Sequence, residues 1–282
     1  MKKGINFWSF AAGTTVETAI AIAKDAGFDG IELAMDHEGL AGLNTADAAI
    51  KAKELAEKAG IALPSLASSI GWDYLLTSTL PEKRQQAKNN IKRQLDMAAV
   101  MGCDTILALA GAVGVDFLPG GGENLMDYED AYDTALEAFR ELAKYAQEVK
   151  VTIAIENVWN KFLLSPLEMR DFIDKIGSPY VGCYFDVGNA IQTGYPEQWI
   201  KILGSRIKKV HFKDYRRDPG GFNCFCDLLS GDVNWPAVTA ALQKAGYNDY
   251  CTAEMIPGYT FYPEQMIYNT AASVTRILKG AQ

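Results

Sequence analysis

Residues 152–156 (TIAIE) and residues 181–186 (VGCYFD) decide the fold, because each is a short apolar run that ends in an acidic residue and predicts a buried strand. A helix-like stretch lies between them and begins at a capping box, Ser165-Pro166-x-Glu168, with proline at the first helical position. Gly177 ends the helical pattern, since only glycine adopts the left-handed conformation of a helix end at little cost. The segment therefore predicts a strand, a helix and a second, parallel strand.

The same unit recurs along the whole chain. Further strand-like runs occupy residues 5–10, 30–34, 63–67, 105–110, 209–213 and 251–255. Further glycines that end a helical pattern just before the next strand stand at positions 27, 60, 102, 204 and 246, and residues 148–150 (EVK) take the place of a glycine once. Eight units of about 35 residues account for the 282 residues of the chain, and eight parallel strands are the number that closes a TIM barrel.

We therefore predict the α/β class, with one (β/α)8 TIM barrel domain over residues 1–282. Two further capping boxes, Thr14-x-x-Glu17 and Thr79-x-x-Glu82, predict where two other helices begin. An open, doubly wound sheet is the alternative, but no Gly-x-Gly-x-x-Gly follows the first predicted strand and the chain has no Gly-Lys-Ser/Thr loop. No linker or low-complexity tract divides the chain, so a single domain is the simpler prediction.

The composition excludes several classes of protein. The chain has 27 Lys+Arg against 35 Asp+Glu and a net charge of −8, whereas proteins that bind nucleic acid draw their affinity from basic residues. It has no run of 18 apolar residues, and polar residues interrupt the stretch after Met1-Lys2-Lys3 that could have formed a signal peptide. The five cysteines are scattered and predict reduced thiols. We therefore expect a cytoplasmic protein that binds neither nucleic acid nor a membrane.

Four side chains of metal-binding type close four consecutive predicted strands. Glu156, Asp186 and Glu254 end the fifth, sixth and eighth strands, and His211 lies in the seventh. Because a barrel brings the carboxyl ends of its strands to one face, we expect these side chains to meet, and three carboxylates at one place repel one another unless a cation is present. One imidazole and three carboxylates suit Mn²⁺ first, then Mg²⁺ or Co²⁺. The sequence thus predicts one divalent metal ion.

The motifs around these residues resemble those of a known superfamily. The similar segments are IEN at 155–157, YFDVGN at 184–189, VHFKD at 210–214, GDVNW at 231–235 and AEM at 253–255. They are similar to the xylose-isomerase-like barrels, and within these most similar to the ketose 3-epimerases and the pentulose-5-phosphate 3-epimerases. The resemblance implies that Glu156, Asp186, His211 and Glu254 hold one metal ion, and that the two glutamates are also the catalytic acid and base.

The resemblance implies an isomerase of carbohydrate metabolism that acts on a small sugar or sugar phosphate. We expect 3-epimerisation of a ketose or ketose phosphate through a metal-stabilised cis-enediolate, because a carboxylate alone is a weak base toward a carbon acid. Isomerisation between an aldose and a ketose would use the same groups. Hydroxypyruvate isomerase and inosose dehydratase are alternatives on the same metal site. A barrel that binds a sugar without converting it is an alternative of another class.

Five residues near the strand ends are predicted to bind the substrate: Trp8, Asn189, Lys161, Lys213 and Arg217. With Arg216, the three basic residues of this set predict a basic rim that could pair with a phosphate through charge-assisted hydrogen bonds. The chain contains only two histidines, His37 and His211, too few for the three-metal nucleases of the same superfamily. We expect His37 to be a solvated loop residue. A homo-oligomer is possible, because the stretch GYTFY at 258–262 could form an interface or a pocket wall.

Overall fold

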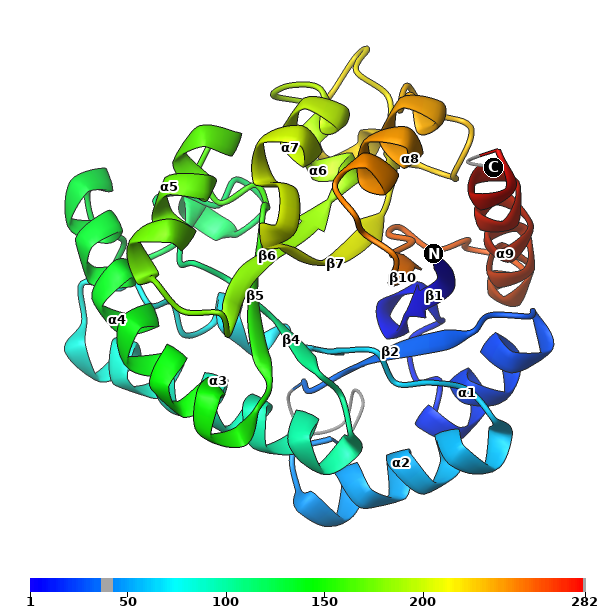
Figure 1. Cartoon of the computed structure of the whole chain (residues 1–282), viewed down its shortest axis with the longest axis horizontal. Helices are drawn as coiled ribbons and strands as arrows, with labels where there is room; N and C mark the ends of the chain where they lie inside the picture. Colours follow the sequence, from blue (N-terminus) through cyan, green and yellow to red (C-terminus); the bar gives the residue numbers. More distant parts are fainter. Residues whose placement is uncertain (37–42, 281–282) are drawn as a thin grey trace.

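Eight strands pair in parallel and close into a barrel, with the helices as an outer ring (Figure 1). This computed structural model describes residues 1–36 and 43–280 of the chain. The barrel strands are β1 (Lys2–Asn6), β2 (Gly30–Ala34), β3 (Leu66–Ala67), β4 (Thr105–Ala108), β5 (Thr152–Glu156), β6 (Val181–Asp186), β7 (Ile207–Phe212) and β10 (Tyr250–Ala253). β1 closes the barrel because it pairs with both β10 and β2. The predicted (β/α)8 TIM barrel is confirmed.

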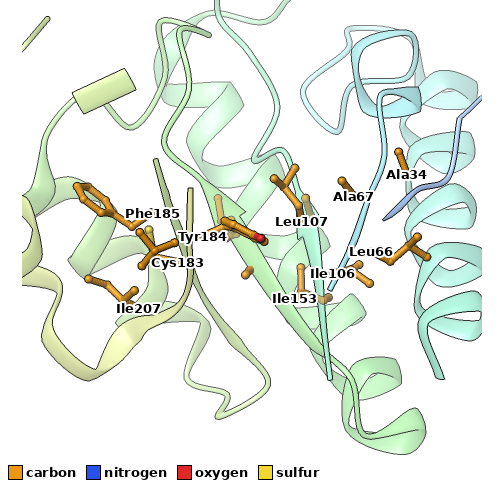
Figure 2. Close-up of a cluster of buried hydrophobic side chains, with 14 of the residues drawn as sticks. Ala34, Leu66, Ala67, Ile106, Leu107, Ile153, Cys183, Tyr184, Phe185 and Ile207 are labelled. Atoms are coloured by element: carbon orange, nitrogen blue, oxygen red, sulfur yellow. The ribbon is translucent and has the colours of Figure 1, made fainter. Parts of the chain in front are cut away.

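Most strand residues are buried, as expected for strands between a barrel interior and a layer of helices. Every residue of β2, β4 and β6 is buried. Figure 2 shows how side chains from neighbouring strands gather, among them Leu66 of β3, Ile106 of β4 and Ile153 of β5. This continuous core holds the strand ends in a fixed relation to one another, and the candidate site lies at those ends.

Nine helices occur in the described part of the chain. They are α1 (Val16–Asp25), α2 (Ala46–Ala59), α3 (Pro81–Met101), α4 (Tyr128–Val149), α5 (Pro166–Ile176), α6 (Val187–Ile191), α7 (Pro196–Leu203), α8 (Trp235–Lys244) and α9 (Pro263–Lys279). Gly60, Gly102 and Gly177 end α2, α3 and α5 in the left-handed conformation, as predicted. Where glycine is missing, Lys150 takes the same conformation at φ 60°. Among the described residues no helix is both long and apolar enough to cross a membrane.

The first strand differs from the prediction. We predict a strand over residues 5–10, whereas β1 spans Lys2–Asn6 and Phe7–Ser9 form a 3-10 turn. The Asn6 side chain accepts a hydrogen bond of 2.7 Å from the backbone N–H of Trp8 and so starts this turn. The apolar pattern misses Lys2 because this strand residue is exposed, with its ammonium over the ring of Tyr250.

Two of the three predicted capping boxes are wrong. The N-cap of α1 is Thr15, which accepts from the backbone N–H of Thr18, so the helix begins one residue later than the pattern at Thr14 predicts. α3 begins after Leu80 with no side-chain cap. Only Ser165 caps its helix as expected, by accepting from the backbone N–H of Glu168. Proline follows immediately at the first helical position of α5 and reinforces that start.

Candidate active site

The register of the parallel strands brings the four predicted metal ligands to one level of the barrel. Asp186 at the end of β6 pairs directly with His211 of β7, and Glu156 at the end of β5 pairs with Tyr184. Glu254 follows β10 and donates its backbone N–H to the carbonyl of Phe212. All four side chains are buried. Their ligand atoms lie within 4.8 Å of one another, so together they could hold a divalent metal ion.

Three carboxylates face one nitrogen of the imidazole. His211 Nδ1 lies 3.3 Å from Glu254 Oε2, 3.9 Å from Asp186 Oδ2 and 4.0 Å from Glu156 Oε1. His211 Nδ1, Asp186 Oδ2 and Glu254 Oε2 are fully buried, yet none of them makes a hydrogen bond of normal geometry to a described residue. Buried polar atoms normally have hydrogen-bond partners. Buried polar atoms that lack a normal hydrogen bond and face one another therefore indicate a ligand-binding site.

The other nitrogen of the imidazole is held by Glu32, a residue that the sequence analysis did not select. His211 Nε2 lies 2.7 Å from Glu32 Oε2, and the same carboxylate accepts hydrogen bonds from Asn6, Ser65 and Tyr184. This arrangement leaves Nδ1 as the free ligand atom, as in metal sites where a carboxylate orients the histidine. One signal in the sequence was available, because Glu32 is a lone charge inside the apolar strand β2, and a buried charge requires a partner.

Lys213 lies inside the carboxylate cluster instead of at a basic rim. Its ammonium is 2.7 Å from Glu254 Oε2 and 3.2 Å from Asp186 Oδ2, and the residue is buried. The ring of Phe225 lies 5.0 Å from the same ammonium. Lys213 therefore supplies a positive charge to the same oxygens that could bind a metal ion.

The two glutamates of the cluster differ in their protonation. Burial and the charge of Glu254 raise the pKa of Glu156 to about 8. Burial also acts to raise the pKa of Glu254, but Lys213 and His211 outweigh it and hold that pKa below its usual range. Burial acts to lower the pKa of His211, and the attraction of Glu32 and Glu254 outweighs it, so the pKa of the imidazole lies well above its ordinary value. Without a metal ion, Glu156 is therefore the more readily protonated of the two glutamates.

A cavity of about 500 Å³ opens beside the cluster. Glu156, Lys213 and Glu254 line it, and so do two of the residues predicted to bind substrate, Trp8 and Asn189. The indole N–H of Trp8 donates to Asp36 at 3.0 Å. The Asn189 amide donates to Glu156 Oε1 at 3.3 Å and to the backbone carbonyl of Asn157 at 3.0 Å. The volume is in the range of ordinary small-molecule sites.

The other two predicted substrate residues lie away from this cavity. Lys161 is more than half exposed and forms an ion pair of 2.5 Å with Asp116. Arg217 donates to the backbone carbonyl of Ile191, and its guanidinium lies 5.1 Å from the ring of Tyr195. Neither is among the described residues that line the cavity beside the cluster. His37 lies outside the described residues.

Residues 20–276 match the xylose isomerase-like TIM barrel family. The chain belongs to this family. It is 25% identical to the protein named "Putative L-ribulose-5-phosphate 3-epimerase SgbU" from Escherichia coli over 251 residues, which are 84% of this chain and 82% of that protein. The protein of the same name from Haemophilus influenzae is 26% identical over 217 residues, 76% of this chain and 73% of that protein.

Solved structures of ketose 3-epimerases share the whole fold. The D-psicose 3-epimerase of Clostridium cellulolyticum, solved with D-tagatose, superposes with a TM-score of 0.80 over all of both chains at 18% identity. A structure described as an L-ribulose 3-epimerase gives a TM-score of 0.78 at 18% identity, over 99% of this chain and 95% of the other. At such identities the likeness establishes the fold, and the chemistry has to be argued from the site.

Proposed function

We propose that this protein is a metal-dependent isomerase that inverts carbon 3 of a ketose or ketose phosphate. The observation that carries the proposal is the convergence of Glu156 and Glu254 with Asp186 and His211 in one buried group beside a cavity. The relatives from Escherichia coli and Haemophilus influenzae, named as 3-epimerases of L-ribulose 5-phosphate, and the solved ketose 3-epimerases support an activity of this class.

The donor set of the cluster fits a divalent cation. Glu156, Asp186, Glu254 and Nδ1 of His211 would hold the ion. This set includes the three buried atoms that make no hydrogen bond of normal geometry, two of which face the Lys213 ammonium. Three carboxylates and one imidazole favour Mn²⁺ over softer metals. When bound, such an ion supplies Lewis-acid polarisation of the ketone, which stabilises negative charge on the substrate oxygens by several kcal/mol.

Glu156 and Glu254 are the proposed acid and base. They come from β5 and from the end of β10, which are separated by two other strands in the barrel. Inversion beside a ketone requires one group to remove the proton from carbon and another to return a proton on the opposite face. Lys213 pairs with Glu254 and keeps it ionised, whereas the pKa of Glu156 is raised to about 8. In the metal-free protein the two carboxyl groups therefore differ in charge, as the two partners of an acid–base pair do.

Proton exchange at carbon tests this function. The Mn²⁺-loaded protein is incubated in D₂O with D-ribulose, D-fructose, L-ribulose and their terminal phosphates, and the products are examined by NMR and mass spectrometry. We expect one deuterium at carbon 3 and the appearance of the 3-epimer of at least one of these sugars. Deuterium at carbon 1 would indicate exchange between aldose and ketose instead. No exchange with any of these substrates would contradict the proposal.

Lys213 gives a prediction on metal affinity that does not depend on turnover. The Lys213→Met variant is expected to bind Mn²⁺ about tenfold more tightly or better, because the ammonium competes for Glu254 and Asp186 and its loss increases the repulsion between the carboxylates. Competition with a fluorescent chelator measures the affinity. The matched control is Lys161→Met, whose ammonium pairs with Asp116 outside the cluster and whose loss should leave the affinity unchanged. An equal or weaker affinity in Lys213→Met would show that the ammonium does not compete.

A further inference from the structure

A second cavity, of about 350 Å³, lies next to the cavity beside the cluster. The two share a wall, because Phe117, Val158, Trp159, Asn189 and Phe222 line both. Beyond this wall the second cavity is lined by apolar side chains, including Phe162, Leu163 and Trp199, and by polar ones, among them Lys161, Gln192 and Thr193. Together the two volumes exceed what a short sugar needs, so a ligand held at the cluster has room to continue into a second compartment.

A row of aromatic rings stands at the boundary of the two cavities. The ring centroids of Trp72 and Phe117 are 5.0 Å apart, those of Phe117 and Phe222 are 5.5 Å apart, and those of Phe222 and Trp159 are 6.3 Å apart. These residues come from four different loops, which follow β3, β4, β5 and the short strand β8 (Asp214–Tyr215). Phe117 is 39% exposed and Phe222 is 48% exposed. Contiguous aromatic side chains left open to solvent mark a binding surface.

Several hydrogen-bond donors around this boundary are already in use. The Trp159 indole N–H donates to the carbonyl of Asn189, and the Asn157 amide donates to the carbonyl of Asp186. In the larger cavity the hydroxyls of Ser68 and Ser69 donate to Met35 and Asp36. A phosphate accepts hydrogen bonds and requires several donors or cations. Among the described residues the basic side chains that line the two cavities are Lys213 and Lys161, and both are in ion pairs.

We propose that the second cavity binds an aryl group at the end of the substrate remote from the ketone, so that the preferred substrate is an aryl-substituted ketose and not a ketose phosphate. The inference rests on the proposed function, because that function places the ketone at the metal cluster. The aryl group passes under Phe117 and Phe222 and packs against Trp159, where edge-to-face contacts are available. It needs no hydrogen-bond donor from the walls, and the two basic side chains there are already in ion pairs.

Binding of three matched ligands tests the inference. The Mn²⁺-loaded full chain is titrated by calorimetry with D-fructose, D-fructose 6-phosphate and 6-O-benzyl-D-fructose, and with the same three forms of the 3-epimer, D-psicose. Within each epimer the three forms share the ketose head and differ only in the group at carbon 6. We expect a benzyl ether to bind about tenfold more tightly than its free ketose or better, with the phosphate no tighter than the free ketose. A phosphate that binds most tightly, or benzyl ethers that bind no better than the free ketoses, would overturn the inference.

Variants of the aromatic row test whether these rings cause the tighter binding of benzyl ethers. Phe117→Ala and Phe222→Ala remove partly exposed side chains and should weaken benzyl-ether binding about tenfold more than D-fructose binding. The control Ile50→Ala removes another partly exposed apolar side chain, on α2, and should change neither. Benzyl-ether binding that is unaffected by both phenylalanine variants contradicts the placement. Turnover separates the two proposals, since a benzyl preference without any epimerisation removes only the proposed function, and epimerisation without that preference removes only the aryl site.

Discussion

Glu156→Gln and Glu254→Gln are each expected to lower kcat/KM for epimerisation by about 10²- to 10⁴-fold, the usual contribution of a positioned acid or base. An amide neither removes nor returns a proton under these conditions, while its size is that of the original carboxyl group. The two side chains belong to different strands of one buried cluster, so neither can replace the other. Initial rates with both C3 epimers, measured at saturating Mn²⁺, test this prediction.

Isotope exchange distinguishes a loss of acid–base function from a loss of metal. Each variant retains one glutamate and should still exchange the C3 proton of one epimer in D₂O, and the two variants should differ in which epimer they exchange. Metal content, measured by mass spectrometry, shows whether the ion is still bound. Glu264→Gln, an exposed change in the first turn of α9, is the control. Equal exchange of both epimers by either variant would exclude the assignment of an acid and a base to the two glutamates.

Glu32→Gln is expected to weaken Mn²⁺ binding by about 10- to 100-fold, the usual effect of removing a group that orients a metal ligand. The Glu32 carboxylate accepts four hydrogen bonds, so an amide in its place presents a donor to groups that are themselves donors. It also leaves the buried imidazole without its nearest negative charge. We therefore expect the free energy of unfolding to fall by about 3 kcal/mol as well.

Two measurements examine the Glu32 prediction separately. Competition with a chelator gives the Mn²⁺ affinity, and urea denaturation of the metal-free protein gives the free energy of unfolding. Glu54→Gln on the exposed face of α2 is the control for both. If Glu32→Gln binds Mn²⁺ as tightly as the wild type, the carboxylate does not orient His211 for metal binding. If Glu32→Gln has wild-type Mn²⁺ affinity but a lower free energy of unfolding, the role of Glu32 is limited to stabilising the fold.

Much of the barrel could be predicted because its signals are local. A short apolar run, a helix with apolar side chains three and four positions apart and a glycine at the helix end depend on neighbouring residues alone. The glycines at 60, 102 and 177 adopt positive φ for this local reason. The first strand was misplaced because β1 is specified by its pairing with β10, about 250 positions away, and its exposed lysine breaks the apolar pattern.

The meeting of the four candidate metal ligands was also predictable, because each of them lies at the end of a strand and the barrel brings all strand ends to one face. The partners of these residues were not predictable. Glu32 meets His211 across 179 positions of sequence, and Lys213 enters the carboxylate cluster instead of joining a basic rim. Both contacts depend on where the closed barrel places strands that are far apart in the sequence.

The sequence alone determines the alternation of strands and helices, the glycines that end helices and the residue types at the strand ends. These features follow from the conformational preferences of residues close together in the chain. Only the tertiary structure decides that Lys161 pairs with Asp116, that Arg217 lies against Ile191 and Tyr195, and that aromatic rings from four loops meet beside the cluster. The reason is physical. A loop side chain takes whichever partner the packing of distant loops brings within reach, and no local pattern records that choice.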